Sequence, residues 1–475
     1  MTLPLSTRLS FAASGTATGL IANGVQYFLL LYYSQVLGLN PFLAGLAMMI
    51  ALVFDAISDP LIGRWSDRMN HRLGRRHPFL FFAIVPAALA YYLLWDPPAL
   101  SEAGLFWYLL GVAIALRLTL TTHAVPFNAL LPELAGAYDD RTKLMNYSYS
   151  ASWFFGTLMA VAMYAYWLAD TPDYPDGAGI LRADGYVQAG AVAAVGAFVC
   201  MLYAALATRR YIPDLAPPPP DSTSVRQMLR EVGTTLNDRS FLAMLMAGTF
   251  SFAASGTSTA LWAYMQTYFW GFDSEQISAM LAAQLLSAVL AFGLIPKLTR
   301  NREKRGVLIQ MSIASMVVGT GPVFLSLLGL FPGTDHAALY PTMLVVGVVQ
   351  VTLIVITSTL TASMIADIVE HRELVTGRRE EGLLFSVQSF IGKVAGGVGV
   401  LTGGVMLGLI EFPTNTAAVD VAREIVERLG WLYGPTLAVF YSLSIVALGF
   451  YQIDRQAHER NLEALGRSQP IGRST

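Results

Sequence analysis

The sequence has 475 residues, of which 55% are hydrophobic and only 13% are charged, and its formal net charge is −2. Soluble domains carry about 25% charged and about 45–50% apolar residues, so this composition excludes an ordinary soluble protein and indicates an integral membrane protein. The near-neutral charge also argues against nucleic-acid binding, which requires clustered basic residues on a soluble face. The one cysteine, Cys200, excludes an intramolecular disulfide.

Long apolar segments run through the whole chain. A helix needs roughly 20 mainly apolar residues to cross the bilayer core, and in lipid such a segment must form its own backbone hydrogen bonds. Twelve segments meet this requirement: 11–37, 41–63, 78–95, 104–131, 147–169, 188–207, 241–270, 277–297, 307–330, 338–364, 384–411 and 431–453. The first is expected to be a retained span, because it lacks a small-residue cleavage site. The sequence therefore predicts an all-α membrane protein with twelve transmembrane helices.

Lysine and arginine gather in the loops on one side of these spans. The loops after the second and eighth spans hold Arg64, Arg68, Arg72, Arg75, Arg76, Lys297, Arg300, Arg302, Lys304 and Arg305. The opposite side holds only Arg182, Arg423 and Arg428. Because basic loops stay on the cytoplasmic side, we expect both termini to be cytoplasmic in a cell (inner or plasma) membrane.

A polar segment divides the chain. Residues 208–240 include four consecutive prolines, 217–220, and are expected to form a semi-rigid cytoplasmic linker. The linker separates a six-helix half, 1–207, from a second half, 241–455, and a cytoplasmic tail covers 456–475. The first helices of the halves share eight of ten positions, FAASGTATGL at 11–20 and FAASGTSTAL at 252–261. Such parallel repeats are typical of transporters that bind substrate between their halves near the membrane midplane.

Two carboxylates stand within the second span, in the segment FDAISDPLIG. Asp55 and Asp59 are four residues apart and share a helix face with Ser58. Acidic residues inside a membrane helix indicate a functional site. Pro60 leaves the carbonyl of Ala56 without its helical partner, so several oxygens are available for an alkali cation. The two carboxylates could instead share a proton, or Asp59 could merely cap the basic loop beyond it.

The fourth span contains an arginine. Arg117, Thr121, Ala124 and Asn128 follow helical spacing and form one stripe. A guanidinium at this depth must face protein or a watery cavity. Either it binds an anionic group on a substrate, or it forms an internal ion pair, with Asp55 as the expected partner. The sequence leaves both interpretations open.

Several motifs carry a resemblance to a known family. FDAISDPLIGRWSDR followed by GRRHPF, VPFNALLPEL followed by DDRTKL, ADIVEHRE and SVQSFIGKVAGG span most of the chain. Together they resemble the glycoside–pentoside–hexuronide:cation symporters, the melibiose-carrier branch of the major facilitator superfamily. The resemblance implies the major facilitator fold and alternating access. It also implies that Asp55, Asp59 and Thr121 bind the coupling cation, Na⁺ or H⁺, that Lys393 lies close by, and that Gln388 contacts substrate.

The substrate class is less defined by the resemblance. Galactoside-transporting members use acidic residues where this chain has Thr18–Gly19 and Ala124. We expect a sugar or glycoside, and the alternative is an anionic amphiphile such as a lysophospholipid, whose phosphate would suit Arg117. No GxxxxGK[ST] loop occurs, so ATP is not the expected energy source and no cofactor is expected. An intramembrane enzyme would need a nucleophile–base pair or metal ligands in the bilayer, and the sequence offers no such pattern.

Charged residues beyond the second span suggest a gate. We expect Asp67, Arg68, Arg75 and Arg76 to form a cytoplasmic gate of salt bridges, although the charges could serve topology alone. The expected partners are a small-molecule solute and membrane lipid, and we expect a monomer.

Overall fold

The computed structural model describes residues 4–135, 138–175, 177–215, 233, 238–300, 302–377 and 381–464. Within these residues every regular element is a helix, apart from one isolated bridge between Thr171 and Tyr174. The all-α prediction is therefore confirmed. Residues 216–232 and 234–237 of the expected linker and residues 465–475 of the expected tail lie outside the described residues.

The helices before the linker are α1 (Leu5–Leu31), α2 (Pro41–Arg68), α3 (His77–Trp95), α4 (Glu102–Ala129), α5 (Leu131–Leu134), α6 (Tyr138–Ala162) and α7 (Ala183–Thr208). Those after it are α9 (Arg239–Ala260), α10 (Trp262–Tyr264), α11 (Ser274–Thr299), α12 (Lys304–Leu327), α13 (Leu339–Thr376), α14 (Glu381–Leu409), α15 (Arg423–Leu448) and α16 (Arg455–Ala464). Turns of π-helix follow α1, α6 and α10, at Tyr32–Val36, Met163–Trp167 and Met265–Phe269.

The long helices of the described residues are consistent with the twelve predicted spans. Among the described residues, 10 helices are long and apolar enough to cross a membrane. Two further helices, α1 with 27 residues and α6 with 25, are more polar than these ten but are also long enough to cross. The predicted ends were less accurate: α6 begins at Tyr138 rather than 147, α13 continues to Thr376 rather than 364, and α15 begins at Arg423 rather than 431. Hydropathy marks only the apolar part of a helix, whereas these helices continue into polar sequence.

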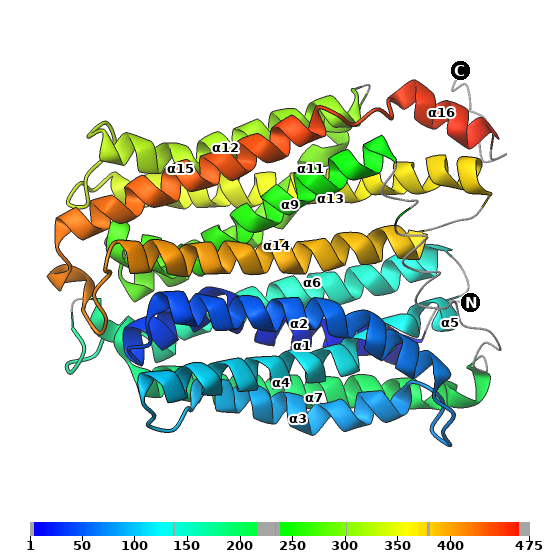
Figure 1. The fold of residues 1–475 in the computed structure, drawn as a ribbon, viewed down its shortest axis with the longest axis horizontal. Helices are drawn as coiled ribbons and strands as arrows, with labels where there is room; N and C mark the ends of the chain where they lie inside the picture. The colour runs from blue at the N-terminus through cyan, green and yellow to red at the C-terminus, as the bar shows by residue number, and fades with distance from the viewer. Residues whose placement is uncertain are drawn as a thin grey trace. The chain divides into compact units, whose positions relative to one another are not determined.

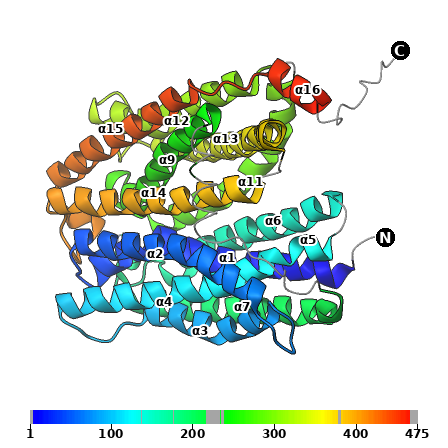
Figure 2. The same cartoon turned by 45° about the vertical axis from the view of Figure 1, so that its right-hand side comes forward.

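The chain forms two compact units. Unit 1 comprises residues 1–222, 255–285 and 396–433, and unit 2 comprises 223–254, 286–395 and 434–475. In unit 1, α1 packs against α6 and α7, α2 packs against α4, and α3 packs against α4 and α7 (Figures 1 and 2). These contacts place α2 beside α4, which carry the paired aspartates and Arg117. The division into the sequence halves 1–207 and 241–455 stays a prediction.

Equivalent glycines of the repeated sequence make the same kind of contact. A Cβ atom on Gly15 would lie 2.0 Å from the carbonyl oxygen of Ser148 in α6. A Cβ atom on Gly256 would lie 2.2 Å from the carbonyl oxygen of Gly396 in α14. Only glycine allows helix backbones to approach this closely. Since α6 and α14 are the fifth spans of the two predicted halves, the repeats correspond in packing as well as in sequence.

One end of unit 1 joins segments from before and after the linker. The hydroxyl groups of Ser34 and Tyr264 are hydrogen bonded to each other, and both side chains are buried. The backbone N–H of Asn415 donates to the carbonyl oxygen of Gln35 over 2.9 Å. We call this set of four residues the sealed end. It links the π turn after α1 with α10 and with the segment after α14.

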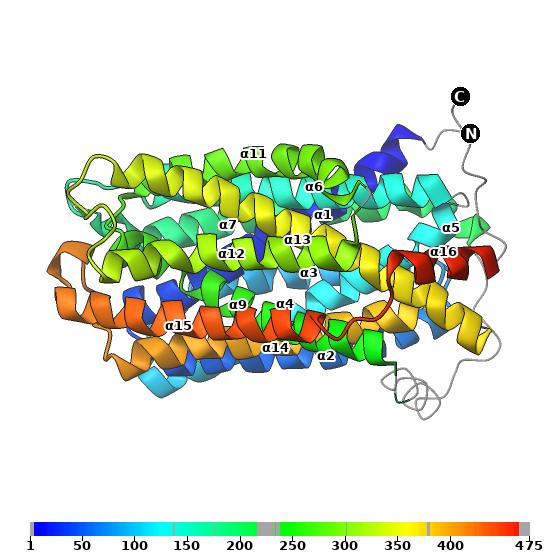
Figure 3. The ribbon, with the colours of Figure 1, turned by 90° about the horizontal axis from the view of Figure 1, so that it is seen from above.

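Unit 2 has its own apolar core. Residues of α9, α11, α12, α13 and the chain after α15 bury one another, among them Phe241, Ala291, Leu308, Ile365 and Tyr451. In this unit α12 packs against α13, and α16 lies against the C-terminal part of α13 (Figure 3). The docked α16 is the beginning of what the sequence suggested as a tail.

Candidate functional site

Two carboxylates and a threonine converge between α2 and α4. Asp55 and Asp59 lie one turn apart on α2, which continues as a helix through Pro60. The Oγ1 atom of Thr121, on the facing helix α4, lies 2.7 Å from Asp55 Oδ1 and 3.0 Å from Asp59 Oδ1. Asp55 and Thr121 are buried and Asp59 is half-buried. The three residues that the resemblance implied as cation ligands are thus brought together.

The Thr121 hydroxyl cannot satisfy both carboxylates. A hydroxyl carries one proton and can donate only one hydrogen bond. If both carboxyl groups are ionised, one of the two short contacts joins oxygen atoms that both act as acceptors. A cation or proton held between Asp55, Asp59 and Thr121 would turn that contact into a favourable one. This set of oxygen atoms, the carboxylate site, can therefore hold a small cation.

Arg117 contributes a positive charge beside the carboxylate site. It stands one turn before Thr121 on α4, and its Nη1 atom lies 3.7 Å from Asp55 Oδ2. The exposed fraction is 24% for the Arg117 side chain and 6% for that of Asp55. Removing one partner of a buried ion pair typically costs about 3–5 kcal/mol, because the other charge is left uncompensated. The internal ion pair, one of the two alternatives left by the sequence, is present in the structure.

The other residues that the sequence suggested occupy different surroundings. Ser58 is buried, but its hydroxyl donates to the backbone carbonyl of Asp55 over 3.1 Å and not to a carboxylate. Asn128 is exposed in the last turn of α4. Gln388 and Lys393 lie half-buried on α14, in unit 2. Their proximity to the carboxylate site of unit 1 stays a prediction.

The residues proposed for the cytoplasmic gate form a network within unit 1. Arg76 is buried, with Nη2 3.5 Å from Asp67 Oδ1 and 2.8 Å from Glu133 Oε1. Arg75 Nη2 lies 2.5 Å from the same Glu133 oxygen. Burial lowers the pKa of the Arg76 guanidinium, and the Glu133 carboxylate opposes this effect. Arg68 is exposed at the end of α2.

Glu133 was not singled out by the sequence reasoning. It lies on α5, within the motif VPFNALLPEL, and joins both arginines of the loop between α2 and α3. The signal available in the sequence was an acidic residue beside a proline, close after the fourth span and on the side that we expect to be cytoplasmic. The network therefore ties α5 to this loop, and whether it gates transport stays a prediction.

Comparison with known proteins identifies the family. The sequence profile described as MFS/sugar transport protein matches residues 10–455. The chain belongs to this family. It is a membrane transport protein and not an enzyme, and the resemblance to the symporters of the major facilitator superfamily is confirmed.

Individual members of the family differ in how much of this chain they match. The symporter sll1374 of Synechocystis is 36% identical over 36% of this chain and 33% of its own length. The isoprimeverose transporter of Lactiplantibacillus pentosus is 24% identical over 95% of this chain and 90% of its own. The sodium-dependent lysophosphatidylcholine symporter 1-A of Danio rerio is 27% identical over 34% of this chain and 30% of its own.

A solved structure supports the same fold. A bacterial homologue of the human lysosomal transporter Spinster aligns with a TM-score of 0.64 and 13% sequence identity, over 99% of this chain and 100% of that one. At this identity the likeness concerns the fold alone. It agrees with the family in assigning the major facilitator fold.

Proposed function

We propose that this family member is a cation:solute symporter and that Asp55, Asp59 and Thr121 bind the coupling cation, Na⁺ or H⁺. The observation that carries the proposal is the Thr121 hydroxyl within hydrogen-bonding distance of both carboxylates. Carboxylates inside a membrane protein are retained at a cost and mark ion or proton pathways. The relatives named symporters support coupled transport.

The substrate that fits best is a sugar or glycoside. The isoprimeverose transporter aligns over 95% of this chain, whereas the lysophosphatidylcholine symporter aligns over 34%. Arg117 would be the phosphate ligand in a lysophospholipid carrier, but its guanidinium already lies 3.7 Å from Asp55. A charge paired in this way is less available to a substrate phosphate. The lysophospholipid is therefore the second candidate.

Transport requires the sealed end to open. The distribution of lysine and arginine predicts that both termini and the Arg75–Arg76 loop are cytoplasmic, so the sealed end would face outward. Alternating access would break the Ser34–Tyr264 hydrogen bond and the Gln35–Asn415 hydrogen bond when the outward-facing state forms. The polar character of these contacts suits an interface that opens and closes.

Uptake into proteoliposomes tests the proposal directly. Isoprimeverose, other glycosides and lysophosphatidylcholine would be offered under an inward Na⁺ gradient, an inward H⁺ gradient or no gradient, with Asp55→Asn as the uncoupled control. We expect gradient-driven accumulation of a glycoside and no accumulation by the variant. Accumulation of lysophosphatidylcholine alone would establish the second candidate. Equal accumulation by wild type and Asp55→Asn would reject the carboxylate site as the coupling site.

A further inference from the structure

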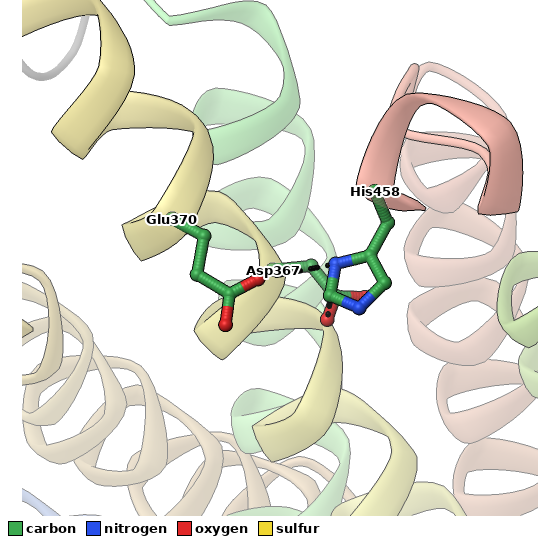
Figure 4. Close-up of side chains that lie close together, drawn as sticks. All are labelled: Asp367, Glu370 and His458. Carbon is green, nitrogen blue, oxygen red and sulfur yellow. Dashed lines mark ion pairs between the residues drawn. The ribbon is translucent and has the colours of Figure 1, made fainter. Parts of the chain in front are cut away.

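A second cluster of ionisable groups lies in unit 2, apart from the carboxylate site. Asp367 and Glu370 of α13 face His458 of α16 (Figure 4). The Nδ1 atom of His458 is 3.5 Å from Asp367 Oδ1 and 3.2 Å from Glu370 Oε2. One ligand atom from each residue lies within 4.8 Å of the others. Both carboxylates belong to the motif ADIVEHRE, to which the proposed transport function assigns no role.

The helices place the three side chains at the end of the bundle. Asp367 and Glu370 are three residues apart and project from one face of α13. With 38 residues, α13 is about 57 Å long, well beyond the bilayer core of about 30 Å. Its charged C-terminal part therefore extends out of the lipid. His458 is brought to it by α16, whose first residue, Arg455, donates its N–H to Glu303 over 3.1 Å.

Two atoms of the cluster are buried without a hydrogen-bond partner. Among the described residues, Glu370 Oε2 and His458 Nδ1 are both shielded from solvent, and neither makes a hydrogen bond of acceptable geometry. They nevertheless approach to 3.2 Å. Buried polar atoms are nearly always satisfied by a hydrogen bond, water or an ion. A ligand between the imidazole and the carboxylates would satisfy both.

We propose that Asp367, Glu370 and His458 bind a divalent transition-metal ion of the zinc type, which fastens α16 to α13. Zinc binds imidazole nitrogen and carboxylate oxygen at about 2.0–2.2 Å in tetrahedral geometry, which places neighbouring ligand atoms roughly 3.4 Å apart. The separations of His458 Nδ1 from Glu370 Oε2, 3.2 Å, and from Asp367 Oδ1, 3.5 Å, fit that spacing. An imidazole favours zinc-like ions over Mg²⁺ and Ca²⁺, which prefer oxygen ligands. Three protein ligands leave the fourth position to water.

The ammonium group of Lys304 lowers the affinity of this site for the metal ion. Its Nζ atom lies 2.8 Å from both carboxylate oxygens of Asp367, and its side chain is 36% exposed. A carboxylate oxygen has two acceptor positions, so Asp367 can hold the ammonium and a metal together. The positive charge still opposes the metal, although solvent reduces the effect. Replacing Lys304 by methionine should therefore tighten metal binding several-fold.

Calorimetric titration of the chelator-treated, full-length protein with ZnCl₂ tests the proposal. We expect wild type to bind one Zn²⁺ more per chain than His458→Ala, or to bind it at least about tenfold more tightly. Glu370→Gln, which keeps the side-chain shape, should lose the same site if His458→Ala proves unstable. His371→Ala is the matched control, because His371 lies 3.5 Å from Asn461 at the same contact between α13 and α16 without belonging to the cluster.

The position of α16 provides a second measurement. Zn²⁺ should slow hydrogen exchange of backbone amides in 455–464 in wild type and in His371→Ala, and not in Glu370→Gln. Co²⁺ should give the intense visible absorption of a tetrahedral site only in proteins that retain His458. Identical Zn²⁺ binding by wild type, His458→Ala and Glu370→Gln would mean an adventitious ion only and would overturn the proposal.

Discussion

The guanidinium of Arg117 lies 3.7 Å from Asp55 Oδ2, between two helices that cross the membrane. The protein thus supplies part of the counter-charge for its own pair of aspartates. Two ionised carboxylates and one guanidinium leave a net charge of about −1, which one monovalent cation would neutralise. In the proposed symport, Arg117 would therefore help to set how strongly the carboxylate site attracts a cation.

Replacing Arg117 should separate its two candidate roles. Arg117→Met removes the charge, so the cation-free variant should be less stable than cation-free wild type. Added Na⁺ should then raise the melting temperature of the variant more than it raises that of wild type. Arg117→Lys keeps the charge without the planar set of donors and should stay close to wild type. Thermal unfolding in NaCl, with choline chloride as the ionic-strength control, measures the difference. A loss of substrate affinity in Arg117→Lys with unchanged cation response would instead favour a clamp on an anionic substrate.

The Thr121 hydroxyl should contribute directly to cation binding. Thr121→Val keeps the side-chain shape and removes the oxygen shared by Asp55 and Asp59. A polar group in contact with a charged partner contributes about 1.5–3 kcal/mol, so losing the Thr121 oxygen as a ligand should lower cation affinity roughly 10- to 100-fold. Thr122→Val is the matched control, since Thr122 is also buried on α4 but donates to the backbone carbonyl of Leu118 over 2.7 Å. Equal cation affinities in the two variants would remove Thr121 from the site.

The repeated glycines should be required for stability in both repeats. Gly15→Ala and Gly256→Ala would each push a methyl group into the backbone of a neighbouring helix, at 2.0 and 2.2 Å. Both variants should unfold at lower temperature. Gly111→Ala serves as the control, because a Cβ atom there meets nothing within 4 Å and alanine favours a helix by about 1 kcal/mol. Unchanged melting of both test variants would contradict the close packing.

Sequence patterns predicted the parts of this protein that depend on local physics. Apolar length located the spans, and spacing of four residues placed Asp55 and Asp59 on one face, as the structure bears out. Glu133 was missed because its partners, Arg75 and Arg76, lie far away in sequence. The docking of α16 was missed for the same reason, since His458 meets α13 only after the chain has folded. Contacts between segments that are far apart in sequence produce no periodic pattern by which a single sequence could predict them.

Lys393 on α14 is predicted to be the mobile counter-charge of the carboxylate site. The resemblance to the symporters implies that this lysine lies near the aspartates of α2, where an ammonium and a carboxylate would compensate each other's charge. With Arg117 paired to Asp55, an ammonium beside Asp59 would bring the empty site to neutrality. A bound cation would then displace the lysine and keep the site neutral.

This exchange predicts how Lys393 variants respond to cations. Lys393→Ala removes the competing charge, so Na⁺ should bind more tightly than to wild type, while Lys393→Arg keeps the charge and should bind Na⁺ as wild type does. A direct test of proximity replaces the one native cysteine, Cys200, and introduces cysteines at Asp59 and Lys393. A disulfide or a short bifunctional reagent should then join the two introduced cysteines. The pairing would be refuted if no cross-link formed and Lys393→Ala bound Na⁺ with the same affinity as wild type. Because Asp59→Cys removes one of the proposed cation ligands, this double-cysteine variant tests proximity alone and not uptake.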